Sequence, residues 1–399
     1  LEVIPDAYAV VNPQVSPNYP FKGLAGVGVA FKVINAIMEE KKLNNEKRAE
    51  LFNYYLPIVA IGTVTDIVPL VQENRAIVKR GLELINTNKN AIPPGLQGMI
   101  KHLNLDNIDT FHIGFMIGPR INAGGRIASP YKSLHTLLHQ GDRQKQALEE
   151  LEAINTKRRK MQEDMFKQAE KQIDIAQNIL FAESEDFHEG IVGIISGRIT
   201  EKYNKPSAIF KINKEENIAT ASLRAPNYFN IVDMLKAHDD ILERFGGHKQ
   251  AGGLTVKLEN LNTLQEKLNT YCNTRINEEQ LEKIIEIDTE LLEKDINTDI
   301  LQKIEKLAPF GEANPEPVFL LNDIAITKVD KVGQKGKGHL KIEGMKGGTP
   351  VQCIFWGKGE EVPQRKEKIN NQETINIIGK IQQDSYRGGQ YINGIHYFK

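Results

Sequence analysis

The chain has 399 residues, too many for one ordinary hydrophobic core, and this length predicts two or three domains. Its hydrophobic fraction of 40% and charged fraction of 26% are typical of a soluble globular protein. No stretch approaches the roughly 20 apolar residues of a membrane-spanning helix, which argues against a transmembrane protein. The two cysteines, Cys272 and Cys353, form neither a zinc cluster nor a disulfide framework, and this usage is typical of a reducing cytoplasm.

Charge is distributed unevenly along the chain. The net charge is only −1, but residues 328–399 contain 13 Lys+Arg against 7 Asp+Glu, a net of +6, which leaves −7 for the rest. Phosphate affinity depends on clustered rather than total charge, so a basic end on an acidic body indicates a local anion-binding surface. A solvated lysine-rich surface is the alternative interpretation.

Residues 1–142 are expected to alternate between strand and helix. The apolar run at residues 7–11 predicts a short buried strand. Apolar residues at three- and four-residue spacing predict a helix over Ala25–Glu40, and Asn45 is the expected N-cap of the next helix. The apolar run Leu56–Val68 suits a buried strand or the end of a helix, and periodicity does not separate the two.

A long polar segment and a second α/β unit follow. One apolar stripe at helical spacing over Arg143–Asn178 predicts a connecting helix of about 50 Å. Residues 179–278 alternate strand and helix as a wound sheet does. The predicted strands are Ile179–Ala182, Ser207–Ile212, Ile218–Leu223 and Leu254–Leu258, and the predicted helices are Gly190–Tyr203 and Asn230–Phe245.

The last segment, residues 284–399, consists of short β-like runs separated by Gly, Lys and Asn. Such runs predict a small barrel, for which the OB-fold is the leading candidate. Trp356 follows an alternating apolar run and is predicted to be a core residue, whereas Tyr386–Tyr391 mixes aromatic and basic groups as base-stacking surfaces do. The predicted strands are Val318–Leu321, Ile324–Val329, His339–Glu343, Val351–Trp356, Thr374–Gln382 and Gln390–Tyr397.

Asp66 is a carboxylate inside a run that is otherwise apolar from Leu56 to Leu70. Burying a carboxylate is costly unless it is paired or binds a cation, and oxygen ligands are those that Mg²⁺ and Mn²⁺ prefer. Two interpretations remain open on chemistry alone, a metal ligand and a cap at a helix end or turn. Arg75 is a candidate paired cation, which favours the second.

Two further groups of residues are candidate anion-binding elements. Arg120 and Arg126 flank a predicted flexible, glycine-rich bend where two guanidinium groups suit phosphate contacts, although a structural turn with two surface arginines explains them equally well. Ser222 and Arg224 end a predicted strand, and the glycine-rich loop Gly246–Gly253 with His248 at its centre precedes the last one. Glycines let backbone N–H groups approach an anion closely, while a buried, satisfied histidine is the alternative for His248. His188 is placed at a helix entry, as part of an anion site or as a plain cap.

Taken together, these segments resemble one family, the RecJ exonucleases of the DHH phosphoesterase superfamily. The resemblance covers nearly the whole chain, and the ordered set is much more specific than any single motif. The matching segments, in the family's order, are Leu24–Lys32, Gly62–Leu70, Gly118–Asn122, His188–Gly193, Ser222–Arg224, Gly246–His248 and Leu307–Pro315.

The resemblance implies an α/β multidomain architecture in four parts. Residues 1–142 would be the C-terminal part of the DHH α/β domain and 143–178 the connecting helix. Residues 179–278 would be the DHH-associated substrate-binding domain, and 284–399 the OB-fold nucleic-acid-binding domain.

The resemblance also implies an activity and a set of site residues. RecJ enzymes hydrolyse single-stranded DNA in the 5′→3′ direction during recombination and repair, with Mn²⁺ or Mg²⁺, so a metal-dependent exonuclease is expected. Asp66 matches the family's late metal-ligand motif and is given a catalytic, metal-binding role. The residues implied in substrate binding are Arg120, Asn122, Arg126, His188, Ser222, Arg224, Gly246, Gly247 and His248.

The remaining metal ligands, including the Asp-His-His motif, are expected upstream of Leu1, so the chain is expected to be a fragment that holds one ligand of a two-metal site. In the intact enzyme such a site would activate water and stabilise the leaving oxygen. Single-stranded DNA is the expected partner of a cytoplasmic, non-membrane monomer, with a helicase and a single-strand-binding protein as candidate partners.

Two alternative functions stay open. A DHH-family phosphoesterase that acts on short oligonucleotides or nucleotide bisphosphates is disfavoured by the OB-like module. A non-catalytic nucleic-acid-binding scaffold is disfavoured by Asp66, because such a protein has no need of a carboxylate there.

Overall fold

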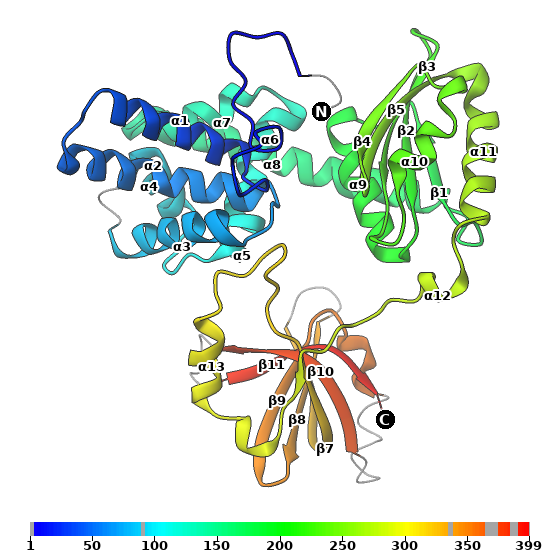
Figure 1. The fold of residues 1–399 in the computed structure, drawn as a ribbon. Helices are drawn as coiled ribbons and strands as arrows, with labels where there is room; N and C mark the ends of the chain where they lie inside the picture. Colours follow the sequence, from blue (N-terminus) through cyan, green and yellow to red (C-terminus); the bar gives the residue numbers. More distant parts are fainter. Residues whose placement is uncertain (1–3, 89–91, 334–337, 364–373, 384–389, 399) are drawn as a thin grey trace. The chain divides into compact units, whose positions relative to one another are not determined.

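A computed structural model describes residues 4–88, 92–333, 338–363, 374–383 and 390–398 (Figure 1). The chain divides into two compact units. The first comprises residues 1–88, 108–110 and 285–399, and the second comprises residues 89–107 and 111–284. The first unit therefore joins the beginning of the chain to its end.

The part expected to be α/β contains helices joined by loops, and no strand occurs among the described residues of the range 1–142. Residues 7–11 form no strand, because they are exposed and have no pairing partner among the described residues. The ambiguous run Leu56–Val68 is helical as far as Thr65, where the helix ends, and its last three residues lie beyond the helix. The helices are α1 (Gly26–Glu40), α2 (Asn45–Thr65), α3 (Gln72–Thr87), α4 (Pro94–His102), α5 (Thr110–His112), a π-helical turn (Ile113–Ile117), α6 (Gly118–Ile127) and α7 (Pro130–Leu138).

Local capping explains several of these boundaries. The N-cap of α2 is Asn44 rather than the predicted Asn45, and its side chain accepts a hydrogen bond from the Lys47 backbone N–H at 2.8 Å. Ser129 caps α7 in the same way, through the backbone N–H of Tyr131. Asn and Ser side chains are good acceptors for the free N–H groups at a helix start. The sequence alone placed the N-cap of α2 one residue too late.

The long helix α8 spans Gly141–Glu170 and ends eight residues before the predicted Asn178. Its 30 residues correspond to about 45 Å. Beyond its end, polar side chains bind backbone groups outside the helix. Gln172 pairs with both the N–H and the carbonyl of Glu183, and Asp174 accepts from the backbone N–H of Ala176.

The second unit contains a five-stranded sheet in the order β1-β2-β3-β5-β4. Helix α9 covers one face, while α10 and α11 contribute to the core on the other (Figure 1). The elements are β1 (Leu180–Ser184), α9 (Glu189–Tyr203), β2 (Ser207–Asn213), β3 (Ile218–Arg224), α10 (Ile231–Lys236), β4 (Arg244–His248), β5 (Ala251–Lys257), α11 (Leu261–Asn273) and α12 (Glu278–Leu281).

One predicted helix of this unit, Asn230–Phe245, is wrong. Helix α10 ends at Lys236, and the last residues of that range begin strand β4, which pairs antiparallel with β5. The predicted loop Gly246–Gly253 is consequently a hairpin. The apolar residues Ile241 and Leu242 pack on the sheet core without continuing the helix, so apolar spacing misled the prediction.

The chain ends in a closed five-stranded barrel in which β7 pairs with β8, β8 with β9, β9 with β11, β11 with β10 and β10 with β7. This confirms the predicted OB-fold. The strands are β7 (Phe319–Val332), β8 (His339–Lys346), β9 (Thr349–Phe355), β10 (Thr374–Gln383) and β11 (Gln390–Phe398). Outside the barrel lie β6 (Thr289–Glu290) and α13 (Thr298–Glu305).

Two expectations about the barrel change. The runs Val318–Leu321 and Ile324–Val329 form one strand, β7, with a register shift between Ile326 and Lys328 where it pairs with β8. Trp356 is 54% exposed and is not a core residue. Part of the segment Tyr386–Tyr391 lies outside the described residues.

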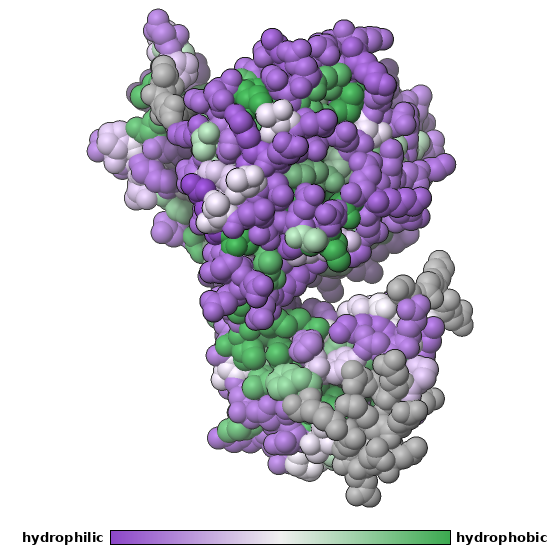
Figure 2. Space-filling model, turned by 90° about the vertical axis from the view of Figure 1, so that its right-hand side faces the viewer, coloured by the Kyte–Doolittle hydropathy of each residue, from purple (hydrophilic) through white to green (hydrophobic). Residues whose placement is uncertain are grey.

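Hydrophilic residues predominate on the molecular face drawn in Figure 2, with hydrophobic residues in small groups. Among the described helices none is both long enough and apolar enough to cross a membrane. Both cysteines are free and buried, and burial raises the pKa of the Cys272 thiol to about 12.

Candidate functional site

Asp66 lies in the first unit, at the exposed C-terminal end of α2. Its backbone N–H donates to the Gly62 carbonyl at 3.0 Å and closes the helix. The expectation of a buried carboxylate is wrong, and among the described residues none donates to the Asp66 side chain. The next residue, Ile67, has a φ of +55° and is 73% exposed. A β-branched residue in this conformation is strained, and such strain is frequent at functional sites.

The loop after Asp66 is held firmly from two sides. The buried Asn74 donates from Nδ2 to the carbonyls of Gly23 and Pro69 at 2.7 and 3.0 Å. The backbone N–H of Leu70 donates to the Glu312 carbonyl at 2.7 Å, and the Leu70 side chain is buried. These bonds fix where α2 ends and α3 begins.

A polar triad anchors the first turn of α3. Glu73 accepts from Tyr19 and forms an ion pair with Lys32. Partial burial opposes ionisation of Glu73, but the hydrogen bonds from Lys32 and Tyr19 outweigh it and lower the pKa of the carboxyl group. The Glu73 carboxylate is therefore engaged by Tyr19 and Lys32.

Arg75 does not form the expected ion pair with Asp66. Its Nη2 atom donates to the carbonyls of Leu307 and Ala308 at 2.9 and 3.1 Å. Asn314 donates to the carbonyls of Leu307 and Pro309 at 3.1 and 2.8 Å. The segment Leu307–Pro315, which sequence analysis singled out without a role, is thus a loop bound to α3 and to the turn that follows Asp66.

The other predicted site residues lie in the second unit. The predicted flexible bend around Arg120 and Arg126 is instead helix α6, which starts with Pro119 in its first turn, where the ring is tolerated. Gly124 packs tightly here, since a Cβ atom would lie 2.4 Å from Ser133 Oγ. Glycine therefore serves close helix packing at this position rather than flexibility.

The side chains of α6 have different surroundings. Arg120 forms an ion pair with Glu152 and donates to the Met116 carbonyl at 2.7 Å, so it is largely engaged. Arg126 is exposed and donates to the Gly190 carbonyl at 3.2 Å, which links α6 to the start of α9. Asn122 is exposed on the same helix.

The charges of Arg120 and Arg126 act on Arg158 of α8, a residue that sequence reasoning missed. It donates to Asn155 and Gln162 at 2.7 and 3.0 Å. Partial burial lowers the pKa of Arg158, and the charges of Arg126, Arg159 and Arg120 lower it further. Four consecutive cations at residues 157–160 were a signal that could have found it.

Ser222 and Arg224 lie on β3, on the sheet face covered by α9. Arg224 Nη1 donates to Ser222 Oγ at 3.0 Å. Burial lowers the pKa of Arg224, and the charge of Arg126 adds to the effect. A Cβ atom on Gly193 would lie 3.1 Å from Ser222 Oγ and 3.2 Å from Arg224 Nη2, so glycine keeps this approach open. The charge of Arg126 thus acts on both Arg158 and Arg224, and this group of like charges suits an anion.

Strand register places the predicted glycines and His248 beside Ser222 and Arg224. Arg224 and His248 both pair with Ala251, and Ser222 and Gly246 both pair with Gly253. Directly paired residues share a sheet face, so Arg224 and His248 flank one side of the sheet. Gly253 and Gly246 follow Ser222 across the neighbouring strands, so the sheet surface beside Ser222 carries no side chains at these two positions. His248 is exposed, which removes the alternative of a buried, satisfied histidine.

His188 caps α9, since its Nδ1 accepts from the Gly190 backbone N–H at 3.1 Å. Gly247 has a φ of +145°, which favours glycine, and a Cβ atom there would lie 2.3 Å from the Ala251 carbonyl oxygen. Gly247 thus has a role in the hairpin, while Gly246 lies in open space.

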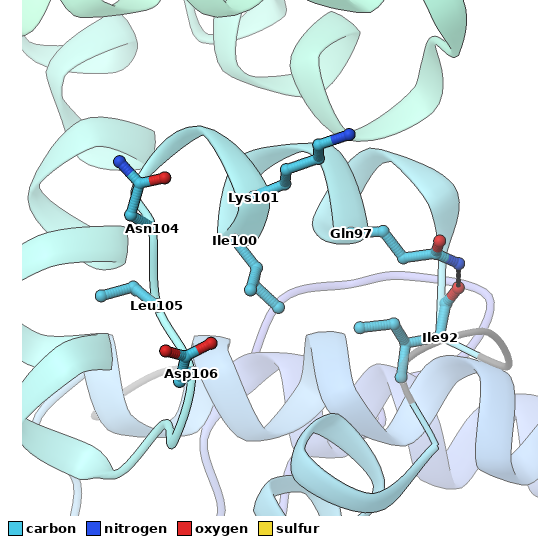
Figure 3. A pocket seen from close by; sticks show the side chains of 7 residues that line it. All are labelled: Ile92, Gln97, Ile100, Lys101, Asn104, Leu105 and Asp106. Carbon is cyan, nitrogen blue, oxygen red and sulfur yellow. Dashed lines mark hydrogen bonds between the residues drawn. The ribbon is translucent and has the colours of Figure 1, made fainter.

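A pocket of about 450 Å³ lies elsewhere in the second unit, at the end of α4 (Figure 3). Ile92 and Ile100 point toward one another, Lys101 points away, and Gln97 donates to the Ile92 carbonyl at 2.7 Å. None of the predicted site residues lines this pocket. It is therefore separate from the arginine cluster.

Comparisons with known proteins identify two domains of the chain. Residues 176–274 match the DHHA1 domain model, and residues 287–395 match the RecJ OB domain model. The chain thus belongs among proteins that combine these two domains.

Over most of its length it is homologous to the RecJ single-stranded-DNA-specific exonucleases. It is 32% identical to the Bacillus subtilis RecJ over 95% of this chain and 47% of that protein. It is 30% identical to the Haemophilus influenzae RecJ over 88% of this chain and 64% of that protein. The chain thus spans about half to two thirds of these relatives.

A crystal structure of Thermus thermophilus RecJ in complex with Mn²⁺ has the same fold. The TM-score is 0.81 at 24% identity, over 97% of this chain and 55% of that one. A second structure, of exonuclease RecJ bound to manganese, gives a TM-score of 0.55 at 26% identity, over 66% of this chain and 64% of that one.

The described residues do not make a complete metal site. No group of three or more His, Cys, Asp or Glu side chains that could hold an ion occurs among them. Asp66, the predicted ligand, would supply one carboxylate, whereas Mg²⁺ and Mn²⁺ sites need several oxygen ligands. We therefore derive no chemical step through a metal.

Proposed function

We propose that this chain forms the substrate-binding part of a metal-dependent 5′→3′ exonuclease specific for single-stranded DNA. The observation that carries the proposal is Arg224 bound to Ser222 on β3, with the charge of Arg126 acting on both Arg224 and Arg158. Arg126 repels both other guanidinium groups, a bound polyanion relieves this repulsion, and guanidinium forks suit phosphate oxygens. The homologous relatives are named single-stranded-DNA-specific exonucleases, which supports the same substrate.

Each group in the cluster has a distinct task in this proposal. Arg224 and Arg158 bind phosphate oxygens near the 5′ end, and the Ser222 hydroxyl adds a hydrogen bond. The absence of side chains at Gly246 and Gly253 lets the sugar–phosphate backbone lie close to the sheet. His248, at the end of β4 two residues beyond Gly246, contacts the terminal phosphate.

The catalytic cations are Mn²⁺ or Mg²⁺ in this proposal, and Asp66 contributes one ligand. Support comes from the RecJ structures that contain these ions and from the exposed carboxylate of Asp66, which has no partner among the described residues. Two buried, unpaired cysteines suit a reducing compartment, so we place the protein in the cytoplasm. We also propose that it acts as a monomer, with a helicase and a single-strand-binding protein as partners.

Binding to labelled oligonucleotides tests the substrate. Fluorescence anisotropy compares a 20-nucleotide single strand that carries a 5′-phosphate with the same strand carrying a 5′-hydroxyl and with a duplex. We expect the 5′-phosphorylated single strand to bind most tightly and Arg224→Gln to abolish that preference. The matched control is Arg244→Gln, an exposed arginine of β4 that donates to Thr255 and lies outside the cluster. Equal affinity for all three DNAs would contradict the proposal.

A Mn²⁺-dependent digest of 5′- and 3′-labelled strands tests the reaction. Stepwise loss from the 5′ end of single strands supports the exonuclease. Tight binding of single strands without digestion would instead favour the non-catalytic binding protein, and digestion of dinucleotides alone would favour a phosphoesterase for short substrates.

A further inference from the structure

A second pocket, of about 440 Å³, lies in the second unit between β1 and α11 (Figure 1). Strand β1 is an edge strand, because within the described sheet it pairs only with β2. The segment that follows α8 completes the pocket wall, through residues 172–177. The residues proposed for DNA binding are not among those that line this pocket, so it is a separate site.

Helix α11 presents a polar face to the pocket. Asn262, Gln265, Glu266 and Asn269 all line it. Their spacing of three and four residues places them on one side of the helix. The leucines of the same helix are buried in the core of the unit. The pocket wall is therefore a continuous row of amide and carboxylate side chains.

The opposite wall is held in place by hydrogen bonds within the protein. Gln172 binds both the backbone N–H and the carbonyl of Glu183, each at 3.0 Å. Lys205 donates to the carbonyls of Ile175 and Gln177 at 2.8 and 2.9 Å. A wall that is already ordered lowers the entropy cost of binding a ligand.

The chemistry of the lining favours a ligand that is cationic and rich in hydrogen-bond donors. Five amide and three carboxylate side chains line the pocket, and none of its described lining residues is basic. The side-chain oxygen of Asn269 is buried and has no hydrogen-bond partner. A buried acceptor without a donor costs free energy, so a ligand that supplies the donor gains affinity.

The arrangement of the carboxylates favours an extended organic cation over a metal ion. Asp174, Glu183 and Glu266 come from three separate segments. Among the described residues, no group of three such side chains could hold a metal ion. Half-buried Phe181 adds an apolar surface to the lining, which suits a methylene chain. The volume is within the range of small-molecule pockets, about 300–1,000 Å³.

We propose that this pocket binds a small polyamine, a flexible methylene chain that carries two or more ammonium groups. One ammonium group donates to the side-chain oxygen of Asn269, and others pair with Glu266 and Asp174. The methylene chain lies on Phe181. This binding site goes beyond the proposed function and does not depend on it, because the two sites share no residue.

Spermidine, a triamine, is the probe for the unmodified 399-residue chain. Isothermal titration at an ionic strength of about 0.15 M measures binding, and we expect one saturable site. Hydrogen exchange locates the site without any substitution. We expect spermidine to slow exchange in residues 172–183 and in α11, and to leave β4 unchanged.

Variants separate specific binding from general attraction to negative charge. Asn269→Leu removes the unpaired acceptor and should weaken spermidine binding by about 10- to 150-fold. Glu266→Gln removes one exposed charge and should weaken it by about 2- to 5-fold. Glu201→Gln is the matched control, since Glu201 is an exposed carboxylate of α9, on the other face of the sheet. It should bind spermidine as the parent chain does.

Four outcomes would overturn the proposal. They are the absence of saturable binding by the parent chain, an equal loss of affinity in Glu201→Gln and Glu266→Gln, slowed exchange of residues 172–183 with Mn²⁺ alone, and tighter binding of an end-blocked dilysine peptide than of spermidine. The last would assign the pocket to a basic protein segment. Titration and exchange use the parent chain, so the test holds even if a variant fails to fold.

Discussion

Replacing Arg75 with Ala tests the connection between α3 and the loop Leu307–Pro315. The substitution removes the donor to the carbonyls of Leu307 and Ala308, at 2.9 and 3.1 Å. Hydrogen bonds from a charged group contribute about 1.5–3 kcal/mol each, and the partial exposure of Arg75 places these near the lower end. We therefore expect a loss of about 2–3 kcal/mol from this contact.

Hydrogen exchange at the Leu70 amide measures this loss locally. That N–H donates to the Glu312 carbonyl, so it becomes exposed when the loop detaches. A loss of about 2–3 kcal/mol corresponds to exchange faster by about 30- to 150-fold, provided that local opening controls exchange. Urea unfolding followed by Trp356 emission reports the same unit independently.

Two variants serve as controls for Arg75. Arg80→Ala removes an exposed ion pair with Glu83 on the same helix and should change exchange at Leu70 very little. Arg75→Lys keeps the charge but lacks the planar fork, so an intermediate effect is expected. If Arg75→Ala leaves the Leu70 amide as protected as Arg80→Ala does, the loop does not depend on this contact and our reasoning is wrong.

Three further predictions concern packing, pH and salt. Gly190→Ala should destabilise the second unit by about 1–3 kcal/mol in thermal melting, because its Cβ would lie 2.0 Å from the Arg126 carbonyl oxygen. Gly197→Ala, with no atom within 4 Å of its Cβ, should be neutral or stabilising. Because the pKa of Glu73 is lowered in the folded protein, its carboxylate stabilises the fold at neutral pH, and this contribution is lost as the pH falls below the ordinary value of 4.5. Glu73→Gln should therefore weaken the fall of the urea unfolding midpoint at acidic pH, measured as a plot of the midpoint against pH. Arg158→Gln should reduce the salt dependence of single-strand affinity by about 0.7 in log–log slope if it contacts one phosphate, and an unchanged slope would remove it from the site.

The sequence determined the features that depend on neighbouring residues. Alternating apolar residues located the barrel strands and most of the second sheet, because a strand buries every second side chain. Ordered short motifs located Ser222, Arg224 and His248 before the register showed that Arg224 and His248 flank the same residue. These motifs are local, so they can be recognised without knowledge of the fold.

Tertiary structure alone decided the features whose partners are distant in the chain. Residues 7–11 are apolar enough for a strand but have no described strand to pair with, so they form none. Trp356 follows an inward-facing pattern yet lies in solvent, and Arg158 joins a cluster with residues of α6 that no spacing connects to it. Arg75 finds its carbonyl partners more than 230 positions away. Burial and hydrogen bonding depend on which segments meet in space, and that contact is set by the whole fold rather than by the local pattern.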